Sequence, residues 1–239
     1  MQAETMRLVK YLSSAGAASR RGAGELVLAG RVAVNGEVTR NPGLQVAPGD
    51  RVTLDGKLVT LEPRKYYVML NKPRGYTCSA ADRHAEHLAV DLIDLPVRLF
   101  SAGRLDRDSE GLILFSNDGD FVEQLTHPSH AVRKRYVVTA DRELVPAELA
   151  KMCAGIEDEG ETLRAISARK CGEKRYTLVL GEGRKREIRR MIAKLGAKTL
   201  RLKRVAVGDL ALGSLPVGKW RELTPEERAQ ALSAASISE

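Results

Sequence analysis

The sequence predicts an α+β protein, with a small N-terminal module ahead of a larger region built on an antiparallel or mixed sheet. The first observation is a change of period, because residues 7–30 carry apolar side chains at helical spacing and residues 32–54 alternate as strands do. The second is that strand and helix candidates after residue 66 do not alternate strictly, which argues against a doubly wound sheet. The third is that 239 residues with 43% hydrophobic content suffice for two modest cores.

Two helices are expected at the start of the module. Leu8 and Leu12 share one face of the first helix, which ends at Gly16. The hydroxyl of Ser19 can cap the second helix, which ends at Gly30. Basic residues cluster on these helices, at Arg7, Lys10, Arg20 and Arg21. The expected unit is therefore a compact ααβ module with basic helices.

A hairpin and one further strand complete the module. Asn35-Gly36 stands between alternating apolar residues, which is the strongest short-range signal for a β-hairpin. A turn then leads into a strand that contains Val52 and Leu54. We place the module at 7–60 and a short linker, stiffened by proline, at 61–65.

The larger region is expected to span residues 66–228, and residues 229–239, rich in Ala and Ser, to form a flexible tail. Its strand candidates are Tyr67–Leu70, Leu112–Phe115, Tyr136–Thr139 and Tyr176–Leu180. Its helix candidates are Phe121–Leu125, Pro146–Met152 and Arg184–Leu195.

The charge balance indicates a polyanionic partner. The chain has 39 Lys and Arg against 31 Asp and Glu, a net charge of +8, and nucleic acid is the first polyanion to consider. Aromatic residues make up only 4% of the chain, which argues against binding single strands mainly by base stacking. No apolar run approaches the roughly 18–20 residues that span a bilayer, and the N-terminus has no signal-peptide pattern, so we expect a cytoplasmic protein.

Neither a disulfide framework nor a calcium loop is expected. The three cysteines, Cys78, Cys153 and Cys171, are odd in number and widely spaced, as is usual for reduced thiols. The loop that begins at Asp106 imitates the start of an EF-hand, but Asn117 stands where the bidentate Glu should be.

A zinc site is not expected either. His84/His87 and His127/His130 have a spacing that can hold zinc on a helix. The first pair lies in a polar segment without apolar periodicity, and the second flanks Pro128, which breaks a helical face. We predict no metal.

The segment Gly103–Gly111 concentrates charges and glycines between two apolar runs and reads as a loop. Asp106 stands between Arg104 and Arg107, which would keep its carboxylate ionised and oriented, as a nucleophile or general base requires. The composition of the segment equally allows a solvated turn.

A strongly basic amphipathic helix is expected behind the glycines at 181–183. Its apolar stripe consists of Ile188, Met191, Ile192 and Leu195. Between residues 184 and 204 there are ten basic side chains and one acid, Glu187, and a phosphate backbone would relieve the repulsion between these cations. Arg189 lies at the border of the stripe, where it could point into a cleft.

The N-terminal module resembles the S4 RNA-binding domain. The resemblance rests on R-L-V-K-Y-L at 7–12, S-R-R at 19–21 and G-R-V-A-V-N-G at 30–36. It implies a docking module whose cations contact the phosphates of a folded RNA.

The rest of the chain resembles the RsuA/RluB/RluF-type ribosomal RNA pseudouridine synthases. The motifs that carry this resemblance are, in order, L-N-K-P-R-G at 70–75, G-R-L-D at 103–106, H-P at 127–128, K-R-Y at 134–136, R-K-R-E-I-R-R-M at 184–191 and L-K-R at 202–204. With the S4 module, the similarity spans about residues 7–227. Two positions depart from the family's usual pattern, since Glu187 replaces Gln and Ser109 replaces Thr.

This resemblance implies the pseudouridine synthase fold, with a central cleft and with neither a cofactor nor a metal. It implies that Asp106 is the nucleophile, that Tyr136 stacks on the target uracil or assists proton removal, and that Arg189 pairs with Asp106. We expect RNA contacts from Arg7, Lys10, Arg20, Arg21, Arg31, Lys72, Arg74, Arg104, Arg107, Lys134, Arg184, Lys185, Arg186, Arg190, Lys203 and Arg204.

The expected function is isomerisation of specific uridines in ribosomal RNA, with the large-subunit (23S) RNA favoured as substrate. The alternatives are a small-subunit (16S) enzyme, or a non-catalytic S4-type RNA-binding factor in ribosome assembly. Asp106 could add to C1′, add to C6 or remove the 2′ proton, and the sequence does not choose among these. The expected partner is ribosomal RNA or an assembly intermediate, bound by a monomer.

Overall fold

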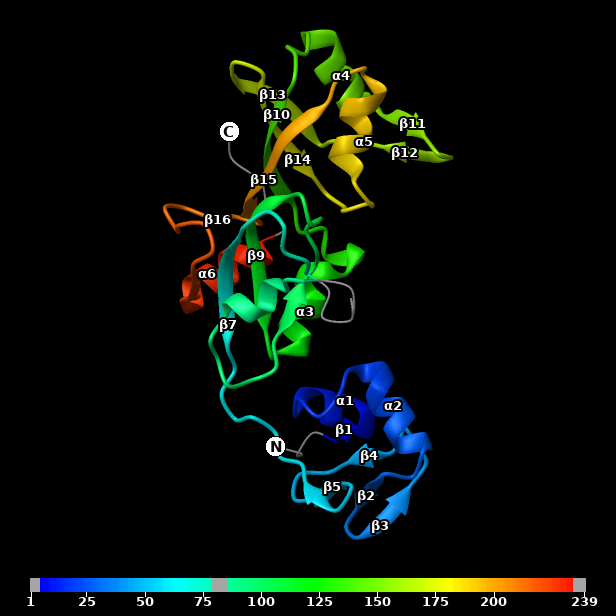
Figure 1. Cartoon of the computed structure of the whole chain (residues 1–239). Helices are drawn as coiled ribbons and strands as arrows, with labels where there is room; N and C mark the ends of the chain where they lie inside the picture. Colours follow the sequence, from blue (N-terminus) through cyan, green and yellow to red (C-terminus); the bar gives the residue numbers. More distant parts are fainter. Residues whose placement is uncertain (1–4, 79–85, 234–239) are drawn as a thin grey trace. The chain divides into compact units, whose positions relative to one another are not determined.

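The computed structural model describes residues 5–78 and 86–233, and the chain divides into two compact units (Figure 1). The small unit consists of Met1–Lys65, Leu95–Arg98 and Asn117–Gly119, and the large unit contains the remaining residues. Within the described residues, no helix has the length and apolar character needed to cross a bilayer.

The small unit packs two helices against short strands. Its elements are β1 (Met6–Arg7), α1 (Leu8–Ser14), α2 (Arg20–Leu28), β2 (Val32–Val34), β3 (Glu37–Thr39), β4 (Gln45–Val46), β5 (Val52–Leu54) and β6 (Lys57–Leu58). Ser19 caps α2 by accepting the Gly22 N–H at 3.0 Å, and Asn35 and Gly36 turn the hairpin with φ of 54° and 89°. Leu8, Leu12 and apolar residues from α2, β2, β4 and β5 form a buried core. The predicted helices and hairpin are confirmed.

A mixed sheet forms the centre of the large unit. Among the described residues its main path runs β13-β14-β10-β15-β9-β7-β17, with β16 paired to β15 and β8 to β9. The strands are β7 (Tyr67–Lys72), β8 (Phe100–Ala102), β9 (Glu110–Ser116), β10 (Lys134–Ala140), β13 (Ser167–Gly172), β14 (Arg175–Leu180), β15 (Thr199–Val207), β16 (Leu210–Ala211) and β17 (Trp220–Glu222). Pairing in this sheet is antiparallel except between β9 and β15, so the expected mixed sheet is confirmed.

Helices and a second hairpin surround this sheet. They are η1 (Ala89–Leu92), α3 (Gly119–Thr126), η2 (Pro128–His130), α4 (Pro146–Ala154), β11 (Ile156–Asp158), β12 (Glu161–Leu163), α5 (Glu187–Lys194) and α6 (Pro225–Leu232). The helix expected from residue 184 begins later, because Arg186 adopts a left-handed conformation with φ of 52°. Residues 229–232 belong to α6 rather than to a tail, since Ala231 is fully buried in the core, while 234–239 lie outside the described residues.

The parallel contact between β9 and β15 depends on a glycine. Gly111 has a φ of 104°, and a Cβ at this position would lie 2.2 Å from the carbonyl oxygen of Arg204. Arg204 is its register partner on β15, and the backbone that would be hit cannot move without breaking the pairing. Only glycine therefore allows the two strands to approach this closely.

We expect Gly111→Ala to destabilise the large unit by at least about 2 kcal/mol, because the new methyl group meets backbone and the conformation is strained for alanine. Trp220, the single tryptophan, lies on β17 of the same sheet, so denaturant unfolding followed by its fluorescence measures the effect. Gly183→Ala is the control, since nothing lies within 4 Å of a Cβ there. Equal unfolding midpoints for the two variants would contradict the assignment.

Candidate active site

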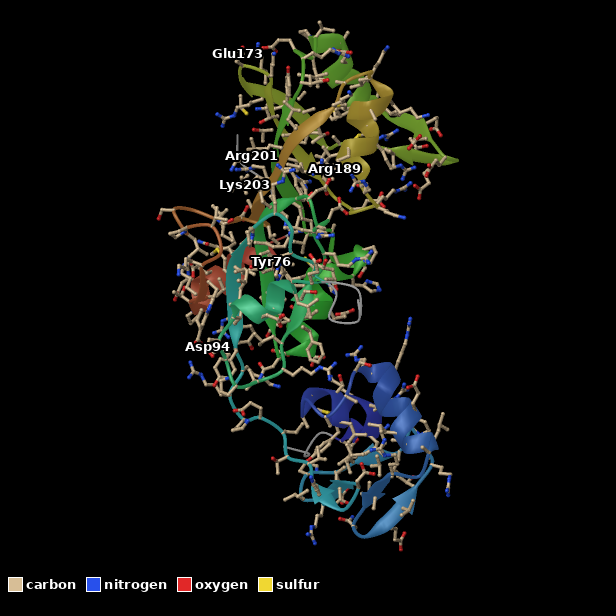
Figure 2. The ribbon with its side chains drawn as sticks, viewed as in Figure 1. Tyr76, Asp94, Glu173, Arg189, Arg201 and Lys203 are labelled. Atoms are coloured by element: carbon tan, nitrogen blue, oxygen red, sulfur yellow. The ribbon has the colours of Figure 1, made fainter. Side chains whose placement is uncertain are left out.

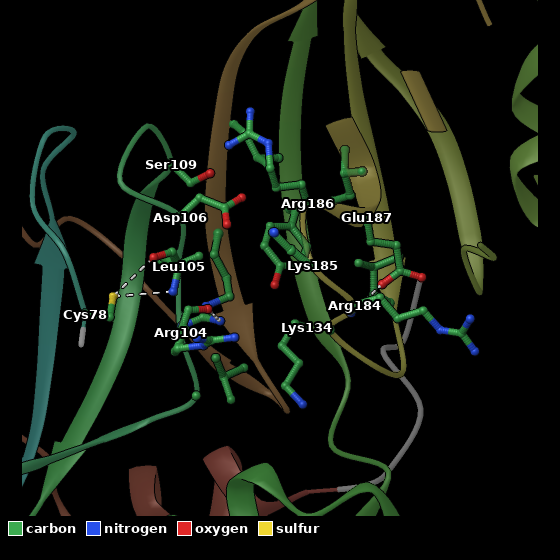
Figure 3. Close-up of a pocket in the computed structure, with 18 of the residues that line it drawn as sticks. Cys78, Arg104, Leu105, Asp106, Ser109, Lys134, Arg184, Lys185, Arg186 and Glu187 are labelled. Carbon is green, nitrogen blue, oxygen red and sulfur yellow. Dashed lines mark hydrogen bonds between the residues drawn. The ribbon is translucent and has the colours of Figure 1, made fainter. Parts of the chain in front are cut away.

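A cavity of about 780 Å³ opens in the large unit (Figure 3). Its walls come from the loop between β8 and β9, the start of β10, the end of β14, the loop before α5, and β15. Asp106, Lys134, Tyr136 and Arg204 are among the residues that line it. The structure thus brings together motifs that lie about a hundred residues apart in the sequence.

Asp106 reaches the cavity from a loop that is held at both ends. The Leu105 N–H donates to Sγ of Cys78 at 3.3 Å, and the Cys78 thiol donates to the Leu105 carbonyl at 3.4 Å. On the other side, the Ser109 N–H donates to the Asp106 carbonyl at 3.0 Å. Figure 3 shows the half-buried Asp106 side chain directed into the cavity. The contacts of Cys78 with this loop could not be predicted from the sequence, because only the fold brings the two segments together.

The expected pairing of Arg189 with Asp106 is wrong, because Arg189 pairs with Asp108. Nη2 of Arg189 lies 3.3 Å from the Asp108 carboxylate and donates to the Asp108 carbonyl at 3.0 Å. Arg186 binds the same carboxylate through two nitrogens, each at 3.2 Å. Burial raises the pKa of Asp108, but the hydrogen bonds and charges of these arginines outweigh it and hold the pKa below its usual range. Asp108 therefore ties the loop to α5 and leaves Asp106 without an ion-pair partner among the described residues.

Tyr136 lies on β10 with its side chain in the cavity wall. The residue is 8% exposed, so its ring is part of the packed wall and could offer one flat face to a base. Lys134 precedes it by two residues on the same face of the strand and also lines the cavity.

Two of the cations expected to contact RNA are buried in the large unit. Lys72 is fully buried, and its ammonium donates to the carbonyls of Pro73 and Tyr76 at 2.9 and 2.8 Å, so the structure does not offer it to RNA. Arg204 is 3% exposed, and its Nε donates to the Leu112 carbonyl at 2.6 Å. Arg204 is a cavity residue rather than a surface contact for phosphate.

Two cations of α5, Arg190 and Lys194, are paired with acids of the hairpin β11–β12, although from the sequence we expected RNA to balance the charge of this helix. Arg190 places Nε 2.5 Å from Asp158 and Nη1 2.6 Å from Glu161. Lys194 lies 3.0 Å from Asp158. Arg190 is half-buried and its guanidinium is occupied by these acids, so the structure does not support the expected contact of Arg190 with RNA. The acids lie about thirty residues upstream in the sequence, where the composition of the helix alone could not reveal them.

The remaining expected contacts lie at accessible positions or are half-buried. In the small unit Arg7, Arg20, Arg21 and Arg31 are exposed and Lys10 is half-buried, with Arg31 bonded to Asp55. In the large unit Arg74, Arg104, Arg107, Lys185 and Arg186 are exposed. Arg184 and Lys203 are half-buried, Lys203 on β15 (Figure 2). Several of these surround the mouth of the cavity.

Glu187, a departure from the family pattern, closes the loop before α5. Its residue is 4% exposed, and its carboxylate accepts the Arg184 N–H at 3.1 Å. Burial is the main reason that its pKa is raised above the usual range. The side chain therefore shapes the cavity wall by holding a backbone turn.

The histidines form no metal site within the described residues. Nδ1 of His127 lies 2.7 Å from the Ser129 hydroxyl, and His84 lies outside the described residues. No group of three His, Cys, Asp or Glu side chains that could hold a metal is present in the described part of the chain.

Comparison with known families matches two segments of the chain. Residues 66–194 match the family described as RNA pseudouridylate synthase, and residues 6–52 match the S4 domain. The chain belongs to the RNA pseudouridine synthase family. The order of motifs read from the sequence and the cavity that gathers them are both in agreement with this membership.

Individual relatives of this synthase are similar over nearly its whole length. An uncharacterized RNA pseudouridine synthase of Aquifex aeolicus is 40% identical, covering 97% of this chain and 96% of that protein. The ribosomal large subunit pseudouridine synthase B of Bacillus subtilis is 38% identical, covering 92% and 93%. The dual-specificity RNA pseudouridine synthase RluF of Escherichia coli is 34% identical, covering 93% and 77%.

A solved structure supports the same assignment. A crystal structure of a pseudouridylate synthase superposes with a TM-score of 0.70 at 31% sequence identity, covering 95% of this synthase and 99% of that chain. The expected pseudouridine synthase fold with an S4 domain at the N-terminus is confirmed.

We expect Glu187→Gln to raise the thermal stability of the large unit at pH 7.5. The amide oxygen can still accept the Arg184 N–H, whereas the cost of burying a charge disappears. Because the folded pKa of Glu187 lies above the unfolded one, the wild-type penalty is present above both values and absent below both. The difference in unfolding temperature, followed through Trp220, should therefore vanish near pH 3.5. A lower stability of the variant at both pH values would contradict this account.

Proposed function

We propose that this synthase converts specific uridines of large-subunit ribosomal RNA to pseudouridine, with Asp106 as the reacting carboxylate. One observation carries the proposal. Of the two carboxylates that line the cavity, that of Glu187 accepts a backbone N–H, whereas that of Asp106 has no hydrogen-bond or ion-pair partner among the described residues. A carboxylate that faces a cavity from a firmly held loop is placed to react with a nucleotide.

The chemistry requires the target base to leave its helix and enter the cavity. Breaking the bond from C1′ to N1 and joining C1′ to C5 turns the base over, and the cavity must hold it throughout. Tyr136 supplies a flat surface for the uracil, and Asp106 adds to C1′ or C6, or removes the 2′ proton. The arginines bound to Asp108 fix the direction of the loop, so they position Asp106 rather than pair with it.

The choice of the large-subunit RNA is supported by the name of the Bacillus subtilis relative. The Escherichia coli relative RluF is called dual-specificity, so the test of this proposal covers more than one RNA. Mapping pseudouridine in 23S and 16S RNA from cells with and without the gene distinguishes the two substrates. We further propose that the protein acts in the cytoplasm as a monomer without a cofactor.

We expect Asp106→Asn to abolish turnover, because the amide can neither act as a nucleophile nor take a proton, while RNA affinity stays close to that of the wild type. The measurement is tritium release from 23S transcripts labelled at uracil C5, since the new C1′–C5 bond expels that hydrogen. Asp209→Asn, an exposed position in the turn after β15, is the matched control. Substantial release by the Asp106 variant would refute the assignment, and absence of release by the wild type would favour a binding factor.

A second variant tests the small unit as the RNA anchor. We expect Arg20→Gln/Arg21→Gln to weaken binding and to reduce the slope of log affinity against log salt by about 2, because each lost phosphate contact releases about one counterion less. Filter binding between about 50 and 200 mM salt measures this slope. Lys151→Gln/Arg175→Gln, two exposed cations of the large unit, is the control of equal charge change. An identical slope for both double variants would contradict the anchor.

A further inference from the structure

We propose that Lys134 and Arg204 form a cationic site in the cavity that stabilises the uracil base while it is detached from the ribose and negatively charged. This inference rests on the proposed function and adds two residues to its chemistry. It assigns to Lys134 a catalytic contact with the base rather than a contact with the RNA backbone.

The strand register places these side chains around Tyr136. Lys134 and Tyr136 are two residues apart on β10, so both side chains leave the same face of the sheet. Arg204 on β15 is the register partner of Tyr136. All three line the cavity, and a lysine side chain is long enough to reach the edge of a base that lies on its neighbour's ring.

Arg204 is buried and Lys134 is half-buried, and neither is paired with an acid among the described residues. The ammonium of Lys134 makes no hydrogen bond or ion pair within residues 5–78 and 86–233. Nη2 of Arg204 is buried and likewise has no hydrogen-bond partner in the described part of the chain. Since Arg204 is 97% buried, this unpartnered nitrogen is costly unless something in the cavity pairs with it. Two cations that line one cavity without an acidic partner are suited to bind an anion there.

The surroundings of Lys134 lower its pKa to about 8, through burial first and the positive charge of Arg204 second. Its register partners on β14 and β15, Leu180 and Val207, are apolar. The loop between β8 and β9 contributes Arg104 and Asp106 to the same cavity. The loop before α5 contributes Arg184, Lys185, Arg186 and Glu187. The register neighbours of Lys134 are therefore apolar, and cations outnumber the two carboxylates, Asp106 and Glu187, in the lining of the cavity, which favours binding of a negative charge.

The isomerisation creates such a charge inside the cavity. When the C1′–N1 bond breaks, its electron pair stays with uracil and spreads over N1, O2 and O4. After the base has turned, C5 bonds to C1′ and loses its proton, and N1 gains one, so atoms and electrons balance without any co-reactant. A cation that has no partner before the reaction binds the negatively charged uracil more strongly than the neutral base. An interaction that is stronger in the charged state than in the ground state accelerates the step that forms the charge.

The position of Lys134 favours the base over a backbone phosphate as the occupant. Its neighbours are the apolar Leu180 and Val207, as suits the face and edge of a base. Exposed cations such as Arg104 and Lys185 are available to phosphates instead. A phosphate on Lys134 would be bound equally before and during the reaction, so that its loss would change affinity rather than rate.

The first test is Lys134→Met under single-turnover conditions, with excess protein and 23S transcripts labelled with tritium at uracil C5. We expect the rate to fall about 100-fold, as is usual when one donor to a developing anion is removed, while the Kd for the RNA stays close to that of the wild type. Lys151→Met, an exposed lysine of α4, is the control. An unchanged rate, or a loss confined to affinity, would overturn the inference even where the wild type is active. Absence of release by the wild type would overturn the proposed function itself.

The second test is the pH profile, which a merely structural lysine would not determine. The wild-type single-turnover rate should fall as the pH rises through about 8, because the ammonium loses its proton. Lys134→Arg should recover part of the rate lost in Lys134→Met and extend it to higher pH, since a guanidinium stays charged. A rate that rises through pH 8, or an arginine variant as slow as the methionine variant, would refute the role.

Discussion

The parallel pairing of β9 with β15 is the constraint on which the site depends. It joins β13-β14-β10-β15 to β9-β7-β17, through the register pairs Lys203 with Glu110 and Arg204 with Gly111. Glu110 is also bound by Arg201, so charge supports the pairing where the backbone contact is short. Without this seam, Asp106 and the residues of β10 would belong to two separate sheets.

Buried charged groups at the site lower the stability of the folded state. Lys72 shows how the fold satisfies a buried cation with carbonyl groups, whereas Arg204 keeps one nitrogen unsatisfied beside the cavity. Groups left in this condition are costly to the folded state, and such costs are tolerated where function needs them. Asp106 and Asp108 differ in the same way. Asp108 is paired with Arg186 and Arg189, whereas the carboxylate of Asp106 is unpaired among the described residues and available to react.

Features that depend on local sequence could be predicted, and those that depend on distant partners could not. The hairpin at Asn35-Gly36 and the loop around Asp106 follow from short patterns that fix turns. The partner of Arg189 depends on how the loop folds back at Ser109. Asp106 and Asp108 are two residues apart, and without that turn the sequence does not show which of the two carboxylates Arg189 binds. The sequence of β15 does not distinguish Arg204 from the exposed basic residues near it, although Arg204 is buried in the folded protein.

The hairpin β11–β12 determines where on the large unit the positive charge of the chain can attract an RNA. Its acids cancel the outward cations of α5, so the field of that helix is short-ranged on this side of the large unit. Positive potential is left around the cavity mouth, where Arg104 and Lys185 remain exposed. An RNA drawn in by long-range attraction is therefore guided to the opening rather than captured along the flank, and the encounter itself becomes part of substrate selection.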